Sequence, residues 1–148
     1  ELSGWLRFIA GWMSDQQVYC KDASKVANLT IPLTPLSSVA EGFKFAVLPV
    51  TKTKAILVES RRATKFACTT TPSQDGVMVY IYDATLGHFQ NFLTPVTPAG
   101  RQTMASSCRF APQPIDTLLR DGDKVTVDGL TIEVLKMGTV DRLRITKG

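Results

Sequence analysis

The feature that most constrains this chain is an Asp-Gly pair between two short runs of alternating apolar residues. Asp128-Gly129 separates residues 124–127 from residues 130–135. An Asp-Gly pair supplies the positive φ angles of a tight hairpin turn. Apolar residues recur at every second position of the later run, so they share one face of a strand. The pattern predicts an antiparallel hairpin with one buried face.

Five further segments have the length and composition of strands: 29–33, 43–50, 54–60, 77–82 and 140–145. Pro32 favours an edge position for the first of them. The run 77–82 is apolar on both faces, which is typical of a central strand. Seven strands after one helix predict a mainly β fold, an antiparallel β-sandwich or barrel-like domain with a short N-terminal helix.

The N-terminal segment carries large apolar residues at helical spacing. Trp5, Phe8 and Trp12 fall on one face of a helix that Ser3 could cap and that Gly11 weakens at its last turn. We expect residues 1–14 to form a docking helix for a protein partner or an adjacent domain, although the core of this domain could also supply the surface on which the helix docks. Self-association through the same side chains is a second interpretation.

The 148 residues fit a single β-rich domain. Its β core is expected over residues 28–146. A long loop is expected at about 84–118, because that stretch contains four prolines and little periodicity. The start at Glu1, without an initiator Met, suggests processing or a fragment of a longer precursor.

Two of the three cysteines lie in polar, Thr/Ser-rich sequence. A disulfide between Cys68 and Cys108 would close a long loop and stabilise the fold, which favours a secreted protein. Cys20 would then be left over. The alternative is a set of three reduced thiols in a cytosolic protein.

The net charge of +4 is mild, and it excludes no partner by itself. No unbroken basic stripe with neighbouring aromatics is present, so we expect no nucleic-acid partner. The basic residues of 52–65 are interpreted as solvated strand faces, with an acidic polysaccharide as the alternative ligand. No apolar run approaches the roughly 18 residues of a membrane span.

Catalytic and metal-binding motifs are missing from the sequence. The single histidine, His88, cannot supply a zinc site of the usual composition, and a dyad with Cys108 has no supporting motif. Asp121 and Asp123 lack the ligand alternation of a calcium loop, so turn chemistry explains them more simply. We therefore expect no catalytic residue, no metal site and no cofactor.

Glu59 and Arg61 end an apolar run, and Arg62 follows. Residues two apart in an extended segment point to the same face, so Glu59 and Arg61 could form an ion pair there. The functional alternative is a docking point for an acidic ligand.

Several motifs, in this order, resemble one known family. They are Trp5-Leu6-Arg7-Phe8, residues 11–18, residues 56–62, residues 76–80 and Leu119-Arg120-Asp121-Gly122-Asp123. Together they resemble the region downstream of the catalytic domain in secreted zinc metallopeptidases of the immune inhibitor A type, in the bacterial M-six-like form. The family's zinc-binding His-Glu-x-x-His motif is absent, so no catalytic role is carried over.

The resemblance implies a non-catalytic extracellular accessory domain of a metallopeptidase, which would serve stability, substrate positioning or surface attachment. The competing hypothesis is a stand-alone structural or adhesive subunit of an extracellular assembly or filament. A small hydrolase that uses His88 is a third reading.

Overall fold

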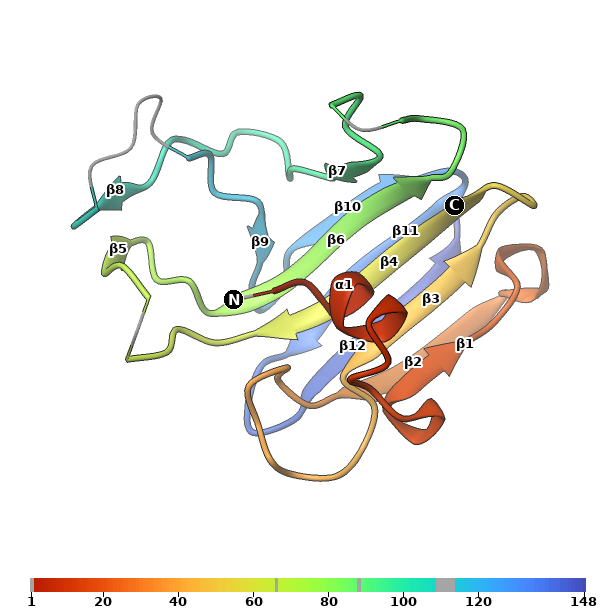
Figure 1. Cartoon of the computed structure of the whole chain (residues 1–148), viewed down its shortest axis with the longest axis horizontal. Coiled ribbons are helices and arrows are strands. Elements are labelled where there is room, and N and C mark those ends of the chain that lie inside the picture. The colour runs from red at the N-terminus through yellow and green to blue at the C-terminus, as the bar shows by residue number, and fades with distance from the viewer. Residues whose placement is uncertain (1, 66, 88, 109–113) are drawn as a thin grey trace.

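The computed structural model describes residues 2–65, 67–87, 89–108 and 114–148 (Figure 1). The described elements are α1 (Gly4–Ile9), the 3₁₀ turns η1 (Asp15–Gln17) and η2 (Ala23–Lys25), and twelve strands. The strands are β1 (Val18–Cys20), β2 (Asn28–Leu33), β3 (Phe45–Pro49), β4 (Lys54–Arg61), β5 (Thr70–Thr71), β6 (Gly76–Asp83), β7 (Leu93–Pro95), β8 (Ala105–Ser106), β9 (Leu118–Leu119), β10 (Lys124–Val127), β11 (Leu130–Lys136) and β12 (Asp141–Lys147).

The strands form three sheets. The large sheet has the order β1-β3-β4-β6-β7, and β9 pairs with β6 off this path. The C-terminal sheet has the order β10-β11-β12-β2, and β5 pairs with β8 in a two-stranded arm. All pairs are antiparallel except β1 with β3. The fold is mainly β, with several antiparallel sheets and one short helix.

The two main sheets share one apolar core. Alternate residues of β4 and β6, such as Ile56 and Val79, point to the same cluster as Ile132 and Leu143 of the C-terminal sheet. We call this side of the large sheet the inner face, and the opposite side, which α1 covers, the outer face (Figure 1). The barrel alternative is wrong for the described residues, because the strand order of each main sheet is open at both ends.

The seven predicted strands are all present, with ends that differ by a few residues. The turn at Asp128 and Gly129 has φ angles of 47° and 76°, and it joins β10 to β11 as the Asp-Gly pair predicts. β2, which contains Pro32, lies at the edge of its sheet. Five short strands, β1, β5, β7, β8 and β9, were not predicted from the sequence.

The expected loop at 84–118 is more structured than predicted. It contains β7, which extends the large sheet, and β8, which pairs with β5. A bridge between Thr103 and Ile115 closes part of the remainder. Prolines do not prevent these short strands, because Pro95 lies at the end of an edge strand, where a missing N–H breaks no ladder.

The N-terminal helix is shorter than the predicted 1–14. Ser3 caps it as expected, since its Oγ accepts a hydrogen bond from the Leu6 N–H at 3.3 Å. The helix ends at Ile9, and Gly11 follows in the left-handed region with a φ of 72°.

Candidate binding site

The end of β4 sends consecutive polar side chains to opposite faces of the large sheet. Glu59 and Arg61 follow Leu57 on the outer face, while Ser60 follows Val58 on the inner face. Arg62 continues this alternation just beyond the strand. Two neighbouring arginines are thereby directed to two different carboxylates.

On the outer face, Glu59 is fully buried. Its Oε2 accepts hydrogen bonds from the Gly4 N–H at 2.6 Å and from the Tyr80 hydroxyl at 2.6 Å. The Nη1 of Arg61 lies 3.3 Å from Oε1, so the predicted Glu59–Arg61 ion pair is present. Burial, together with the Glu59 carboxylate, raises the pKa of the Tyr80 phenol far above its usual range, so Tyr80 remains a donor to Glu59.

Gly4 comes too close to the large sheet to carry a side chain. A Cβ there would lie 2.7 Å from Cδ2 of Phe45 and 3.1 Å from Oε2 of Glu59. The next residue, Trp5, packs on Tyr82 with ring centroids 4.4 Å apart. The N-terminal segment is therefore fixed to the outer face by both polar and aromatic contacts.

On the inner face, Arg62 forms a two-pronged pair with Asp141, which is fully buried at the start of β12. Its Nη1 and Nη2 lie 3.1 Å and 2.5 Å from the two carboxylate oxygens. Ser60 donates its hydroxyl to the same carboxylate at 2.7 Å, and the Gly138 N–H donates at 3.0 Å. This cluster joins the large sheet to the C-terminal sheet.

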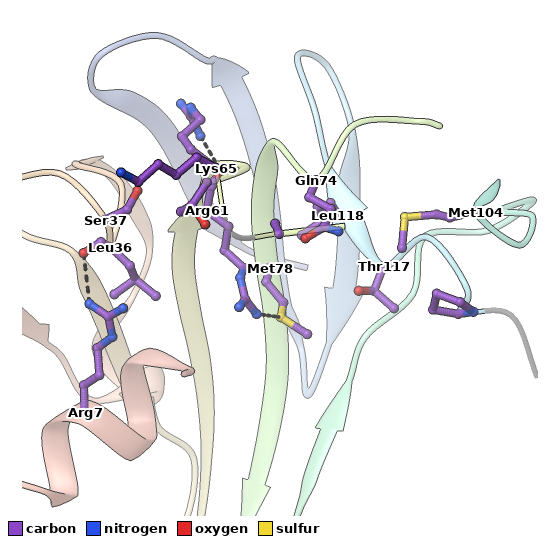
Figure 2. A pocket seen from close by; sticks show the side chains of 14 residues that line it. Arg7, Leu36, Ser37, Arg61, Lys65, Gln74, Met78, Met104, Thr117 and Leu118 are labelled. Atoms are coloured by element: carbon purple, nitrogen blue, oxygen red, sulfur yellow. Dashed lines mark hydrogen bonds between the residues drawn. The ribbon is translucent and has the colours of Figure 1, made fainter. Parts of the chain in front are cut away.

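A cavity of about 830 Å³ opens beside these pairs. Arg7 of α1, Arg61 and Arg62 at the end of β4, and Lys65 beyond it line the cavity, and no acidic side chain is among the described lining residues. Met78 and Leu118 add apolar surface. In the view of Figure 2, Met104 and Thr117 stand across the cavity from Arg7, Arg61 and Lys65. The cavity is basic with an apolar floor.

A buried lysine holds the loop that forms one wall of the cavity. Lys44 is 5% exposed, and its Nζ donates to the carbonyl oxygens of Pro35 at 3.3 Å and Ser38 at 2.5 Å. Burial lowers the pKa of Lys44, and the nearby Arg7 guanidinium lowers it further. Arg7 also donates to the Leu36 carbonyl oxygen at 3.1 Å. These contacts give the wall a defined position.

The arm encloses the cavity from the other side. The disulfide between Cys68 and Cys108 is present, as predicted, with Cα atoms 5.6 Å apart. It joins the two chain segments that carry β5 and β8, and the Thr69 N–H also donates to Ser107 Oγ at 2.9 Å. The disulfide is compatible with an extracellular protein. Cys20, at the end of β1, is an exposed free cysteine.

The three predicted docking side chains divide into two groups. Trp5 and Phe8 pack against the protein's own outer face, around Phe45 and Leu57. Trp12 is 69% exposed, and Ile9, which the sequence analysis did not name as a docking residue, is 59% exposed. Leu2, before the helix, is also exposed at 47%, whereas Met13, which follows Trp12, packs on the outer face with Trp5 and Phe8.

The other candidate positions carry structural contacts. Asp121 accepts from the Lys136 ammonium at 2.6 Å and from the Met137 N–H at 2.5 Å, and Asp123 accepts from the Arg120 N–H at 2.8 Å. Asp123 therefore serves its own turn, as predicted, whereas Asp121 connects that turn to the end of β11. His88 lies outside the described residues. Within the described ranges, no group of three histidine, cysteine or carboxylate side chains is placed to hold a metal ion.

Sequence reasoning missed Gly4, Lys44, Tyr80 and Asp141. For Asp141 a signal existed, because it is in phase with Leu143 and Ile145, whose alternation marks the buried face of β12. An acidic residue in such a phase indicates a buried charge that requires a cationic partner. The identity of that partner, Arg62, follows only from the approach of the two sheets.

No protein-family model matches the chain, no curated protein matches its sequence, and no solved structure matches its fold. The relation to metallopeptidases therefore stays a prediction from the sequence motifs. None of the helices in the part of the chain that the structure describes is long and apolar enough to cross a membrane.

Proposed function

We propose that the protein is a secreted, β-sandwich-like accessory domain of a metallopeptidase, and that it docks on a neighbouring domain through its N-terminal segment. The observation that carries the proposal is the contrast within that segment. Residues 4–8 are fixed to the outer face through Glu59 and the aromatic cluster, while Ile9 and Trp12 point away from it and remain exposed. A rigid base with an exposed tryptophan is suited to docking.

The motif order supports the choice of neighbour. In the resembling metallopeptidases, the stretch similar to residues 5–18 follows the catalytic domain directly. Ile9 and Trp12 would then face that domain, and the accessory domain would stabilise it or position its substrates. The Cys68–Cys108 disulfide suits the extracellular setting that this function needs.

The competing hypothesis is self-assembly, in which Ile9 and Trp12 pack against another copy of the chain. One measurement separates the two. The intact mass of the natural protein, before and after reduction, should lie well above the 16.2 kDa of this chain if a catalytic domain is covalently attached. A mass near 16.2 kDa would contradict the accessory role.

A second measurement tests the docking surface itself. In a Trp5→Phe variant, Trp12 is the only tryptophan of this chain, so acrylamide quenching of its fluorescence reports its exposure. We expect strong quenching in the isolated chain at low concentration and protection when the metallopeptidase domain is added. Protection that instead grows with the concentration of this chain alone would support self-assembly. If neither the metallopeptidase domain nor a higher concentration of the chain protected Trp12 from quenching, both forms of docking would be overturned.

A further inference from the structure

We propose that the Cys68–Cys108 disulfide is a redox switch: its reduction by a dithiol releases the arm and opens the cavity, while the core of the two main sheets stays folded. The arm is the two-stranded sheet of β5 and β8, which the disulfide joins. The inference goes beyond the docking of Ile9 and Trp12 and does not depend on it, because both residues lie outside the arm and the cavity lining.

The arm is built from two excursions of the chain that leave the large sheet and return to it. Residues 62–75 connect β4 to β6, and residues 96–117 connect β7 to β9. The sheet itself fixes where each excursion rejoins it, because β4 and β9 both pair with the first residues of β6. The disulfide therefore cross-links two loops with fixed ends, and the strands of the large sheet come together without it.

The arm and its connections add nothing to the apolar core. Each described residue of 62–75 and of 99–115 is half-buried or exposed. Neither apolar cluster takes a member from these described residues. Movement of the arm thus exposes no core side chain, and the core can stay folded while the arm opens locally.

The hydrogen bonds between β5 and β8 form a very short ladder. Thr70–Thr71 pairs with Ala105–Ser106, and the Ser107 N–H donates to the carbonyl oxygen of Thr69 at 2.8 Å. A two-stranded ribbon is marginally stable in water even when it is longer than this. The covalent bond therefore decides whether the two strands stay paired.

The switch operates by thiol–disulfide exchange with a dithiol, which is the reductant. Cys68 and Cys108 are half-buried, so the dithiol can approach from solvent. One of its thiolates attacks a sulfur of the disulfide, forms a mixed disulfide and releases one cysteine, which takes up a proton. Its second thiol then displaces the other cysteine. The dithiol leaves as a disulfide, and the two electrons and two protons that it gives up are found in the two cysteine thiols.

Release of the arm changes the cavity because one cavity wall belongs to the arm and its connections. Ala67 and Gln74 flank β5, Met104 precedes β8, and all three line the cavity. In Figure 2, Met104 stands across the cavity from Arg7. Gln74 also donates to the carbonyl oxygen of Cys68 at 3.0 Å, which connects the wall directly to the disulfide. When the two strands separate, this wall loses its fixed position.

The first test counts thiols in the folded chain. A Cys20→Ser background removes the exposed free cysteine, which could otherwise exchange with the disulfide. We expect dithiothreitol, without denaturant, to produce two maleimide-reactive thiols per chain. If these thiols appeared only at urea concentrations that unfold the core, the arm would not open by itself and the proposal would be wrong.

Hydrogen exchange locates the opening. After reduction and alkylation, amides bonded within the arm, such as that of Ser107, should exchange about tenfold faster or more. The amides of β4 and β11 should keep their rates. A Cys68→Ser/Cys108→Ser variant in the same background should match the reduced chain, which separates loss of the bond from effects of alkylation. Unchanged exchange in the arm, or equal acceleration in β11, would overturn the proposal.

Methionine oxidation tests access to the cavity. In the Cys68→Ser/Cys108→Ser variant, hydrogen peroxide should oxidise Met78, on the cavity floor, about threefold faster or more than in the chain that keeps the disulfide. Met137 packs against the core cluster and should keep its rate, so it is the internal control. Peptide mapping by mass spectrometry measures both residues. Equal rates for Met78 in the two chains would contradict control of the cavity by the disulfide.

Discussion

The two faces of the large sheet use the same pair of chemical groups in different ways. On the inner face, Arg62 and Asp141 form a cluster in which hydrogen bonds reach both carboxylate oxygens, and it joins two sheets. On the outer face, Glu59 gives one oxygen to Gly4 and Tyr80, and Arg61 lies 3.3 Å from the other. The inner pair connects sheets of the core, whereas the outer pair connects the sheet to a six-residue helix.

The inner pair therefore contributes to the stability of the whole domain, whereas the outer pair holds the segment that carries the exposed Ile9 and Trp12. Strands of both sheets pack around the inner pair, so its loss should lower the unfolding free energy of the whole domain. A buried carboxylate that holds one short segment affects mainly that segment, since the core cluster on the inner face does not depend on it. The outer face is therefore the side on which binding surfaces can change without loss of the fold.

The largest effect is expected for Asp141→Ala. The substitution removes the carboxylate that accepts from Ser60 and the Gly138 N–H, and it leaves the charge of Arg62 with only neutral acceptors, the carbonyl oxygens of Arg61 and Gly138 among them. Removal of one partner of a buried pair costs about 3–5 kcal/mol of unfolding free energy. Urea denaturation, followed by tryptophan fluorescence, measures this loss. A loss below about 1 kcal/mol would show that the inner pair does not hold the sheets together.

A smaller and local effect is expected for Glu59→Gln. The amide keeps the volume and one acceptor oxygen but loses the charge that Arg61 faces, a cost of about 1–3 kcal/mol. Hydrogen exchange should accelerate at the amides of residues 4–12 and stay unchanged in β11, because the outer pair holds only the helix segment. Equal acceleration in β11 would contradict the division between the two faces.

The third effect is expected for Tyr80→Phe, which removes one donor to Glu59 and should cost about 0.5–1.5 kcal/mol at pH 8. It also has a pH signature. The raised pKa of Tyr80 means that the phenol stays neutral when folded, while in the unfolded chain it ionises near pH 10. Its contribution is complete below pH 10 and falls as the pH rises further.

The comparison of wild type and Tyr80→Phe between pH 8 and pH 11 isolates that signature. Other tyrosines and lysines titrate in the same range, but they are common to both proteins. We expect the urea midpoint of the wild type to fall more steeply above pH 10 than that of the variant. Parallel pH profiles would indicate that Tyr80 titrates alike in the folded and unfolded protein.

Patterns among neighbouring residues predicted the faces of the strands and the hairpin turn correctly. The alternation in β4 and the two-residue spacing of Glu59 and Arg61 identify their shared face, and the Asp128-Gly129 turn specifies its hairpin, because each depends only on neighbouring residues. The helical spacing of Trp5 and Phe8 also predicted correctly that they share one apolar face. Their periodicity carries no information on which surface they bury against, and that surface is the protein's own sheet.

Contacts between distant segments were beyond the reach of such patterns. β1 pairs in parallel with β3, and a three-residue strand has no periodicity that would identify it. The cavity depends on Arg7, Arg61 and Lys65 meeting across three elements, which charge counting along the chain cannot show. The basic residues of 52–65 were considered together, yet Lys52 and Lys65 lie beyond opposite ends of β4.

The smallest effect is expected for Glu133→Ala. This variant tests whether burial determines how much unfolding free energy each of these ion pairs contributes. Arg144 holds Glu133 through Nε at 3.1 Å and Nη2 at 2.6 Å, closer than Arg61 lies to Glu59. The pair joins β11 to β12 on the solvent side of the C-terminal sheet, where the side chain of Arg144 is 46% exposed. Water solvates both groups once the pair is broken, so the loss should be about 0–1 kcal/mol. If urea denaturation gave Glu133→Ala a loss as large as that of Asp141→Ala, distance rather than burial would determine the strength of these pairs, and the contrast between the faces would need another cause.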